Sequence, residues 1–226
     1  MLKTLTVTAG VMLLANGHWA KEEETPDHRL RAAADVLHDM MSAPDRGVPR
    51  DLLEKAECVI VIPGLKKAAF VFGADYGKGY ALCREARGWS GPAALSVGGG
   101  SFGAQIGVES TDLIMLVMNR HGMERIAQDK FTIGADVSAA AGPIGRQTGA
   151  HTDISMNAEL LTWSRVHGLF AGISLDGTVV KKDGGEDRRL YGREVTNREV
   201  LYAKVARPEA GRILVAELDR FPRRRG

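Results

Sequence analysis

Apolar positions recur with the period of an amphipathic helix from about residue 25 onward. The helix start is well marked, because Thr25 supplies a capping hydroxyl, Pro26 suits the first helical position and Asp27 places an acid in the first turn. Pro44 ends this helix, and a second, short helix begins at Pro49, so the pattern predicts an N-terminal helical hairpin. The apolar stripe of the first helix is Leu30, Ala33, Ala34, Leu37, Met40 and Met41, and the residues away from it are Arg29, Arg31, Asp35 and Asp39.

At Cys58 the pattern changes to β-branched and aromatic runs, CVIVIP and then AAFVFGADYGKGYALCR, which predict strands. Eleven glycines lie among the 44 residues from Gly64 to Gly107. Glycine at this density within strands indicates bulges, turns and close backbone approach in a curved sheet. Further strands are predicted at 112–119, 131–145, 154–165 and 168–180, and short helices at 121–130, 196–200 and 208–221. The predicted fold class is α+β, with a glycine-rich curved antiparallel sheet or barrel-like core, an N-terminal helical hairpin and a C-terminal helix.

The first 20 residues have the build of a secretory signal peptide. Lys3 forms a short basic start, an apolar run follows from about Leu5 to Ala15, and an acidic cluster begins at Glu22. The apolar run is short for a membrane-spanning helix, and an ordinary buried N-terminal helix is the alternative. We therefore expect a signal peptide at 1–20, a single domain at 25–221, a basic tail at 222–226, and export to the periplasm or the extracellular space as a protein peripheral to a membrane.

Composition and charge narrow the function classes. With 226 residues, of which 44% are hydrophobic, the chain suffices for one substantial core. A net charge of +2 with 26% charged residues argues against disorder and against a dedicated nucleic-acid surface. Residues 186–226 carry eleven Lys or Arg against seven Asp or Glu, a net +4. A basic end of this kind either meets phosphates and acidic lipid headgroups or is a solubilising tail.

The stretch GGGSFGAQIG at 98–107 contains, at Gly98, Gly100 and Gly103, the spacing of a dinucleotide-binding loop. Such a loop opens a helix whose N-terminus receives the pyrophosphate. Here the following residues alternate at the period of a strand, and no acid lies about 20 residues further on. We therefore interpret the stretch as part of the sheet.

No constellation of catalytic residues is apparent. The histidines lie singly, no cysteines have metal-ligand spacing, and Ser101 lies in G-x-S-x-x-G rather than in a nucleophile elbow. Asp136, Asp153 and Asp176 lie in or beside predicted turns, where Asp is favoured for its bonds to the backbone. The sequence thus predicts no enzyme, no cofactor and no metal site.

The two cysteines, Cys58 and Cys83, both fall in predicted strands. Export permits a disulfide between them. Two positions in a sequence do not establish a pairing, and two free, buried thiols are the equal alternative.

Basic residues gather near the predicted hairpin ends, with one lysine pair after Pro63-Gly64 and another after Asp176-Gly177. Side chains at neighbouring tips would form a phosphate-binding rim. The alternative is that lysines at strand ends keep the sheet edges soluble. The candidate lipid contacts are Lys66, Lys67, Lys78, Arg84, Arg87, Lys181 and Lys182.

Four ordered blocks, which begin at Pro49, Arg87, Phe131 and Ser164, resemble the SYLF domain family. They read PRDLLEKAECVIVIPGLKKAAFVFGADYGKG, RGWSGPAALSVGGGSFGAQIGVESTDLIMLVMN, FTIGADVSAAAGPIGR and SRVHGLFAGISLDGTVV. The resemblance implies a domain without catalytic activity that binds acidic phospholipids, phosphoinositides in eukaryotic members. It also implies actin binding for some fungal members.

The primary hypothesis is an exported, non-enzymatic domain that binds anionic lipid at an envelope membrane through the basic residues. The helix from Thr25 to Met41 is then either an apolar wedge or a helix packed on the sheet. The alternative hypothesis is a structural or interaction protein of the envelope that binds a protein partner through its sheet face. No nucleic-acid partner is expected, and an exported protein has no occasion to meet actin.

Overall fold

The computed structural model of the chain describes residues 25–43, 47–69, 72–86, 88–102, 107–143, 158–166 and 169–222. The expected signal peptide at 1–20, the candidate lipid contact Arg87, and Gly103 of the glycine-rich stretch lie outside the described residues, as do the arginines of the expected basic tail.

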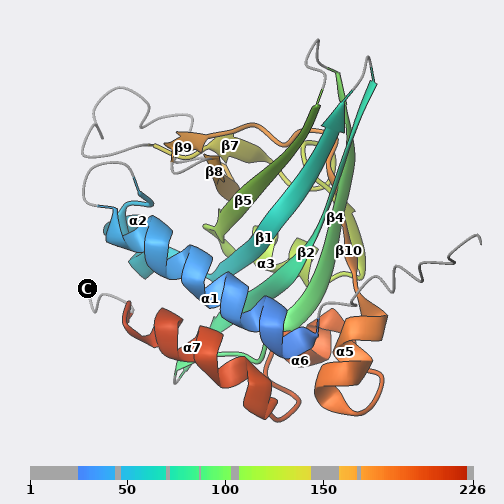
Figure 1. Ribbon diagram of the computed structural model, residues 1–226. Coiled ribbons are helices and arrows are strands. Elements are labelled where there is room, and N and C mark those ends of the chain that lie inside the picture. The colour runs from blue at the N-terminus through green and yellow to red at the C-terminus, as the bar shows by residue number, and fades with distance from the viewer. Residues whose placement is uncertain are drawn as a thin grey trace, which may run out of the picture.

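Ten strands in the described part of the chain form one curled sheet (Figure 1). They are β1 (Cys58–Ala69), β2 (Phe72–Glu85), β3 (Gly88–Trp89), β4 (Ala93–Phe102), β5 (Gly107–Val117), β6 (Lys130–Thr132), β7 (Ala139–Ala141), β8 (Leu160–Val166), β9 (Leu169–Gly172) and β10 (Val179–Lys182). Across the sheet the order is β6-β10-β4-β2-β1-β5-β8-β7, with β3 paired to β2 and β9 to β8. Paired strands are antiparallel except β7 and β8. The expected α+β class with a curved, mainly antiparallel sheet is confirmed.

The helices of the described residues are α1 (Pro26–Ser42), α2 (Arg50–Lys55), α3 (Arg120–Ile126), α5 (Gly184–Tyr191), α6 (Asn197–Leu201) and α7 (Arg212–Asp219), with a 3-10 turn η1 (Glu209–Gly211) before α7. Helices α1 and α7 lie side by side across one end of the long strands (Figure 1). The helix that packs along α1 is therefore α7, and α2 is a six-residue helix that leads into β1.

Each face of the sheet has its own core. On the face that carries α1 and α7, which we call the helix face, Val61 packs with Leu37 of α1. On the opposite face, Ile60 packs with Leu201 of α6. Neighbouring strand residues thus serve different cores, as the alternation of a strand requires. Because the apolar stripe of α1 is buried in the first core, α1 is a packed helix rather than an exposed wedge.

A bulge in β1 explains two of the glycines in β2. The pairing of β1 with β2 shifts register between Val61 and Lys66. A Cβ atom at Gly79 would lie 1.9 Å from the carbonyl oxygen of Val61, and one at Gly77 would lie 2.7 Å from the side chain of Leu65. No side chain fits in so small a space, so β2 needs glycine where it crosses the bulge.

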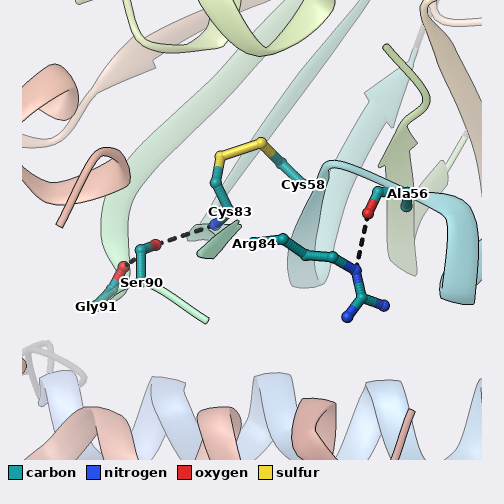
Figure 2. The surroundings of a disulfide bond; sticks show 6 residues. All are labelled: Ala56, Cys58, Cys83, Arg84, Ser90 and Gly91. Atoms are coloured by element: carbon teal, nitrogen blue, oxygen red, sulfur yellow. Dashed lines mark hydrogen bonds between the residues drawn. A yellow bond between two sulfur atoms is a disulfide. The ribbon is translucent and has the colours of Figure 1, made fainter. Parts of the chain in front are cut away.

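A disulfide joins Cys58 at the start of β1 to Cys83 near the end of β2 (Figure 2). The two residues are directly opposite in the strand pair, and both are fully buried. The hydroxyl of Ser90 accepts a hydrogen bond from the N–H of Cys83 at 3.0 Å. Of the two cysteine states that the sequence leaves open, the structure has the bonded one.

The predicted strand at 131–145 is interrupted by a turn. Its described part contains the last two residues of β6, then the turn, and then the whole of the short strand β7. Gly134 has a φ of 87°, in the left-handed region that favours glycine. Nearby, the carboxylate of Asp136 accepts a hydrogen bond from the N–H of Thr132 at 2.7 Å. The turn therefore follows from the local preferences of Gly and Asp.

Helix α5 is absent from the sequence prediction. Gly184 and Gly185 at its start are poor helix formers, and they favour the prediction of a loop. Asp183 caps the helix, because its carboxylate accepts a hydrogen bond from the N–H of Glu186 at 3.1 Å. This helix carries the buried charges described below.

Candidate functional site

Lys78 and Lys181, two of the predicted lipid contacts, point to the helix face of the sheet. Lys78 precedes Tyr80 by two residues on β2, and Tyr80 is buried in the core under α1. Lys78 is opposite Ser96 of β4, and Ser96 is opposite Lys181 of β10. Directly opposed residues share a face, so Lys181 lies in the same row as Lys78.

Lys66 belongs to the same face, because it is opposite Tyr76 of β2, which lies two residues before Lys78. Lys130 of β6 extends the row at the other end, since it is opposite Lys181. Sequence analysis missed Lys130, and the long-range pairing of β6 with β10 has no local signal. We call Lys66, Lys78, Lys130 and Lys181 the basic strip.

The second lysine of each predicted pair points to the other face of the sheet. Lys67 is opposite Asp75 of β2 and Glu109 of β5, and follows Lys66 by one residue. Lys182 is opposite Leu95, which is buried in the core of the opposite face. A single rim made of both lysine pairs therefore does not form.

Arg84 has a structural position at the disulfide end of β2. Its guanidinium donates hydrogen bonds to the carbonyl oxygens of Ala56 at 3.0 Å, Leu53 at 2.9 Å and Phe221 at 3.0 Å (Figure 2 shows the first). It also lies over the ring of Trp89, 4.2 Å from the centroid. Arg84 thus joins α2 and the C-terminal segment to β2 and does not belong to the basic strip.

The basic strip carries little compensating negative charge. Lys78 forms an ion pair of 2.6 Å with Asp183, and the hydrogen bond to this carboxylate raises the pKa of Lys78. Lys66 donates a hydrogen bond to the hydroxyl of Ser110 at 3.0 Å. The other two lysines of the strip are exposed, and neither forms an ion pair with a described residue. Three of the four positive charges are therefore left uncompensated by salt bridges within the described structure.

A buried charge cluster lies beside the basic strip, between α1, α5 and β2. Arg29 and Glu186 form an ion pair of 2.6 Å, with side chains only 8% and 1% exposed. The hydroxyl of Tyr80 donates a hydrogen bond of 2.6 Å to Glu186, and Arg189 donates one of 2.9 Å. Burial and the bond to Glu186 raise the pKa of Tyr80. The expected position of Arg29 away from the buried stripe is wrong, because its charge has a partner inside the protein.

Asp187 of α5 is a second buried carboxyl group. It is fully buried, and its Oδ1 accepts a hydrogen bond from the N–H of Ala94 at 2.9 Å. Burial raises the pKa of Asp187 to about 7. The neighbouring charges of Asp183 and Glu186 act in the same direction, whereas the bond from Ala94 and the charge of Lys182 oppose the shift.

We expect Asp187 to make the free energy of unfolding fall as the pH rises toward 7. An unfolded aspartate has a pKa of about 4, so between about pH 4 and pH 7 the folded state holds a proton that the unfolded state has released. This contribution is complete below about pH 4 and is lost as the pH rises through about 7. Urea denaturation should show a smaller loss of stability from about pH 5 to about pH 8 in Asp187→Asn than in the wild type.

The same substitution at Asp35, an exposed residue of α1, controls for the loss of one negative charge. Equal pH dependence in the wild type and in Asp187→Asn would show that Asp187 does not titrate in this range.

A hollow of about 620 Å³ opens at the disulfide end of the sheet, and Glu57, Glu85, Arg120 and Tyr202 are among its lining residues. Burial raises the pKa of Glu85, although Arg207, at 3.8 Å, opposes the shift. The described residues contain no group of His, Cys, Asp and Glu that could hold a metal ion. Among the helices described, none is long and apolar enough to span a membrane.

A protein-family model described as Ysc84, Las17-binding protein actin regulator, matches residues 98–221, which is just over half of the 226-residue chain. The chain belongs to this family, the Ysc84 or SYLF family. The resemblance seen in the sequence is thereby confirmed. The matched range includes the second half of β4 and the whole of β10 and α5, and so part of the basic strip and of the buried charges.

Several known proteins are similar to most of this chain. An SH3 domain-containing protein of Schizosaccharomyces pombe is 34% identical over 167 residues, which cover 72% of this chain and 39% of that protein. SH3 domain-containing YSC84-like protein 1 of Xenopus laevis is 31% identical over 199 residues, 84% of this chain and 59% of that protein. LAS seventeen-binding protein 3 of Saccharomyces cerevisiae is 30% identical over 182 residues, which cover 79% of this chain and 39% of that protein. The chain thus spans less than two thirds of the length of these relatives.

Proposed function

We propose that this Ysc84-family chain is a non-enzymatic domain that binds anionic phospholipid at a membrane surface. The observation that carries the proposal is the basic strip, in which lysines from four strands point to one face with a single salt-bridged carboxylate. Strands in a sheet are about 4.8 Å apart, so the strip is about 19 Å across from β6 to β1. A lysine near an anionic membrane contributes about 1 kcal/mol to binding.

The position of the strip supports contact with a planar surface. The long strands β1, β2, β4 and β5 extend beyond α1 and α7, so these helices leave the far part of the helix face uncovered (Figure 1). Lys66, Lys130 and Lys181 are exposed on this face, and the ion pair with Asp183 holds Lys78 on the same face. Phosphate groups in a headgroup layer would face these ammonium groups.

The binding test uses the alternation of the strands as its internal control. The double variant Lys66→Gln/Lys181→Gln removes two charges from the basic strip, and Lys67→Gln/Lys182→Gln removes the neighbouring two charges from the opposite face. Both variants have the same net charge. In co-sedimentation with anionic vesicles we expect the first variant to bind about 30-fold more weakly than the wild type, and the second to change little.

Raised salt should weaken wild-type binding, because the charges are exposed. Equal losses in the two double variants would contradict the basic strip as the contact surface. Absence of vesicle binding by the wild type would contradict the proposed function itself.

A second candidate function is the binding of a protein partner through the same uncovered part of the sheet. The observation in its favour is that the family description and the Saccharomyces cerevisiae relative both carry the name of a Las17-binding protein. Capture of a defined protein by the purified domain, with no retention on vesicles of any charge, would favour this function over lipid binding.

We further propose that the membrane is one reached by export. Support comes from the signal-like residues 1–20 and from the buried disulfide, since disulfides persist in oxidising compartments. N-terminal sequencing of the protein recovered from a periplasmic or secreted fraction tests this, and an intact leader on cytosolic protein would contradict it.

A further inference from the structure

One aromatic side chain stands exposed within the basic strip. Tyr76 of β2 is 55% exposed, and it is one of two large hydrophobic residues in the described structure that are markedly exposed, the other being Ile213 of α7. Tyr76 is opposite Lys66, and Lys78 follows it on the same face. Two lysines therefore flank an exposed phenol ring.

The sheet beside Tyr76 is bare on its other side. The residue opposite Tyr76 on β4 is Gly98, the first glycine of the GGGSFG stretch. A Cβ atom at Gly98 would meet only the carbonyl oxygen of Asp75, at the ordinary contact distance of 3.6 Å. Packing therefore does not require glycine here, in contrast to Gly79.

Glycine within a strand lowers stability by about 0.5 to 1 kcal/mol relative to alanine. Besides bulges and bends, glycine within a strand marks sites that a ligand or another backbone approaches closely. At Gly98 the surface left open is the flank of the Tyr76 ring, inside a patch of positive charge.

We propose that Tyr76 is the interfacial anchor with which the basic strip docks on a bilayer. The inference rests on the proposed function and assigns the way in which that face meets the lipid. The lysines contact the phosphate layer, and the ring of Tyr76 lies at the boundary between headgroups and acyl chains, with the bare backbone at Gly98 allowing lipid to pack against it. Tyrosine suits this depth because its ring is apolar and its hydroxyl remains hydrated. A bilayer is the occupant that the surface fits, because positive charge surrounds the aromatic side chain.

Removal of the ring tests the anchor. In titrations with anionic vesicles, Tyr76→Ala should bind about fivefold to tenfold more weakly than the wild type, since the apolar area that leaves water on docking is lost. Its salt dependence should stay that of the wild type, because no charge changes. Ile213→Ala, which removes the other exposed hydrophobic side chain, should bind like the wild type.

Fluorescence reports the depth of the same position. In Tyr76→Trp the introduced indole takes an exposed position. The wild type already contains Trp19, Trp89 and Trp163, of which the last two are buried. Spectra of the variant and of the wild type, each recorded with and without vesicles, cancel these three contributions, and their difference isolates residue 76. We expect its emission to shift to shorter wavelength on addition of anionic vesicles and to be quenched by lipids brominated near the headgroup. The variants Gly98→Ser and Gly98→Glu test the bare flank: the small hydroxyl should have little effect on vesicle binding, and the carboxylate, which adds one negative charge, should weaken it about fivefold.

The outcomes separate the anchor from the lipid-binding proposal. If Tyr76→Ala and Ile213→Ala both bind vesicles as tightly as the wild type, and Tyr76→Trp shows no emission shift, the anchor is overturned. The basic strip is then a purely electrostatic contact. No binding of anionic vesicles by the wild type would overturn both proposals. Circular dichroism of each variant identifies a loss that is due to unfolding, in which case the emission shift and quenching of Tyr76→Trp decide the question.

Discussion

Replacement of Glu186 by glutamine should lower the free energy of unfolding by about 3 to 5 kcal/mol, because it removes the buried carboxylate that pairs with the buried guanidinium of Arg29. The Glu186 side chain is 1% exposed, and Arg29, its ion-pair partner at 2.6 Å, is 8% exposed. The glutamine has nearly the same size, so the change removes charge rather than volume. The pair joins α1 to α5, and urea denaturation of the variant measures its loss.

A double variant separates the buried charge from the packing around it. Arg29→Met with Glu186→Leu replaces both charges by apolar groups of similar volume, a change that is often neutral or stabilising for a buried pair. We expect this double variant to be within about 1 kcal/mol of the wild type. Tyr80 keeps an acceptor in it, since its hydroxyl also lies 3.3 Å from the carbonyl oxygen of Pro26.

A matched control comes from the exposed ion pair of Glu209 and Arg212, whose side chains are 77% and 76% exposed. Glu209→Gln should cost less than about 1 kcal/mol. A loss in Glu186→Gln as small as in this control would contradict a buried charge cluster between α1 and α5.

Much of the architecture could be predicted from periodicity alone. The stripe from Leu30 to Met40 and the run that begins at Cys58 follow the periods of a helix and a strand, and both lie where the pattern placed them. Arg29 could not be placed correctly, because its burial depends on Glu186, 157 residues away. A charge at the edge of an apolar stripe is exposed or paired, and only tertiary contacts decide which.

The candidate site also depends on tertiary contacts that the sequence pattern does not contain. That Lys66 and Lys67 point to different faces follows from strand alternation, and the sequence contained this signal. Which of the two shares the face of α1 depends on the bulge between Val61 and Lys66, since an extra residue reverses the alternation beyond it. Lys130 belongs to the basic strip because β6 pairs with β10, and no local sequence pattern indicates this pairing.

The glycine-rich stretch contains glycines of more than one kind. Gly77 and Gly79 are required by the close crossing of β1 and β2, and they account for two of the glycines that indicated a curved sheet. Gly98 has room for a side chain and lies beside Tyr76. Gly98, the first glycine of the spacing that resembles a dinucleotide-binding loop, therefore lies on the surface of the sheet. Its lack of a side chain leaves room beside Tyr76 for a molecule that approaches the sheet.

Loss of the disulfide should lower the free energy of unfolding by about 3.5 kcal/mol without weakening vesicle binding. Cys58 and Cys83 are separated by 25 residues, and closing a loop of that length restricts the unfolded chain by this amount in the chain-entropy model. The double variant Cys58→Ala/Cys83→Ala removes the bond without leaving a free thiol, and urea denaturation of the oxidised wild type and the variant gives the difference.

The disulfide and the proposed lipid-binding residues lie at different ends of the strand pair, so this variant should lose stability and still bind vesicles. The disulfide lies where β1 begins and β2 ends, next to the contacts of Arg84, whereas Lys66 and Tyr76 lie toward the other end of the same strand pair. The register of β1 with β5 also holds β1 in place when the bond is absent. A folded variant that loses vesicle affinity would show that the disulfide end of the sheet sets the geometry of the basic strip, and a variant as stable as the wild type would show that the bond adds nothing to the strand pairing.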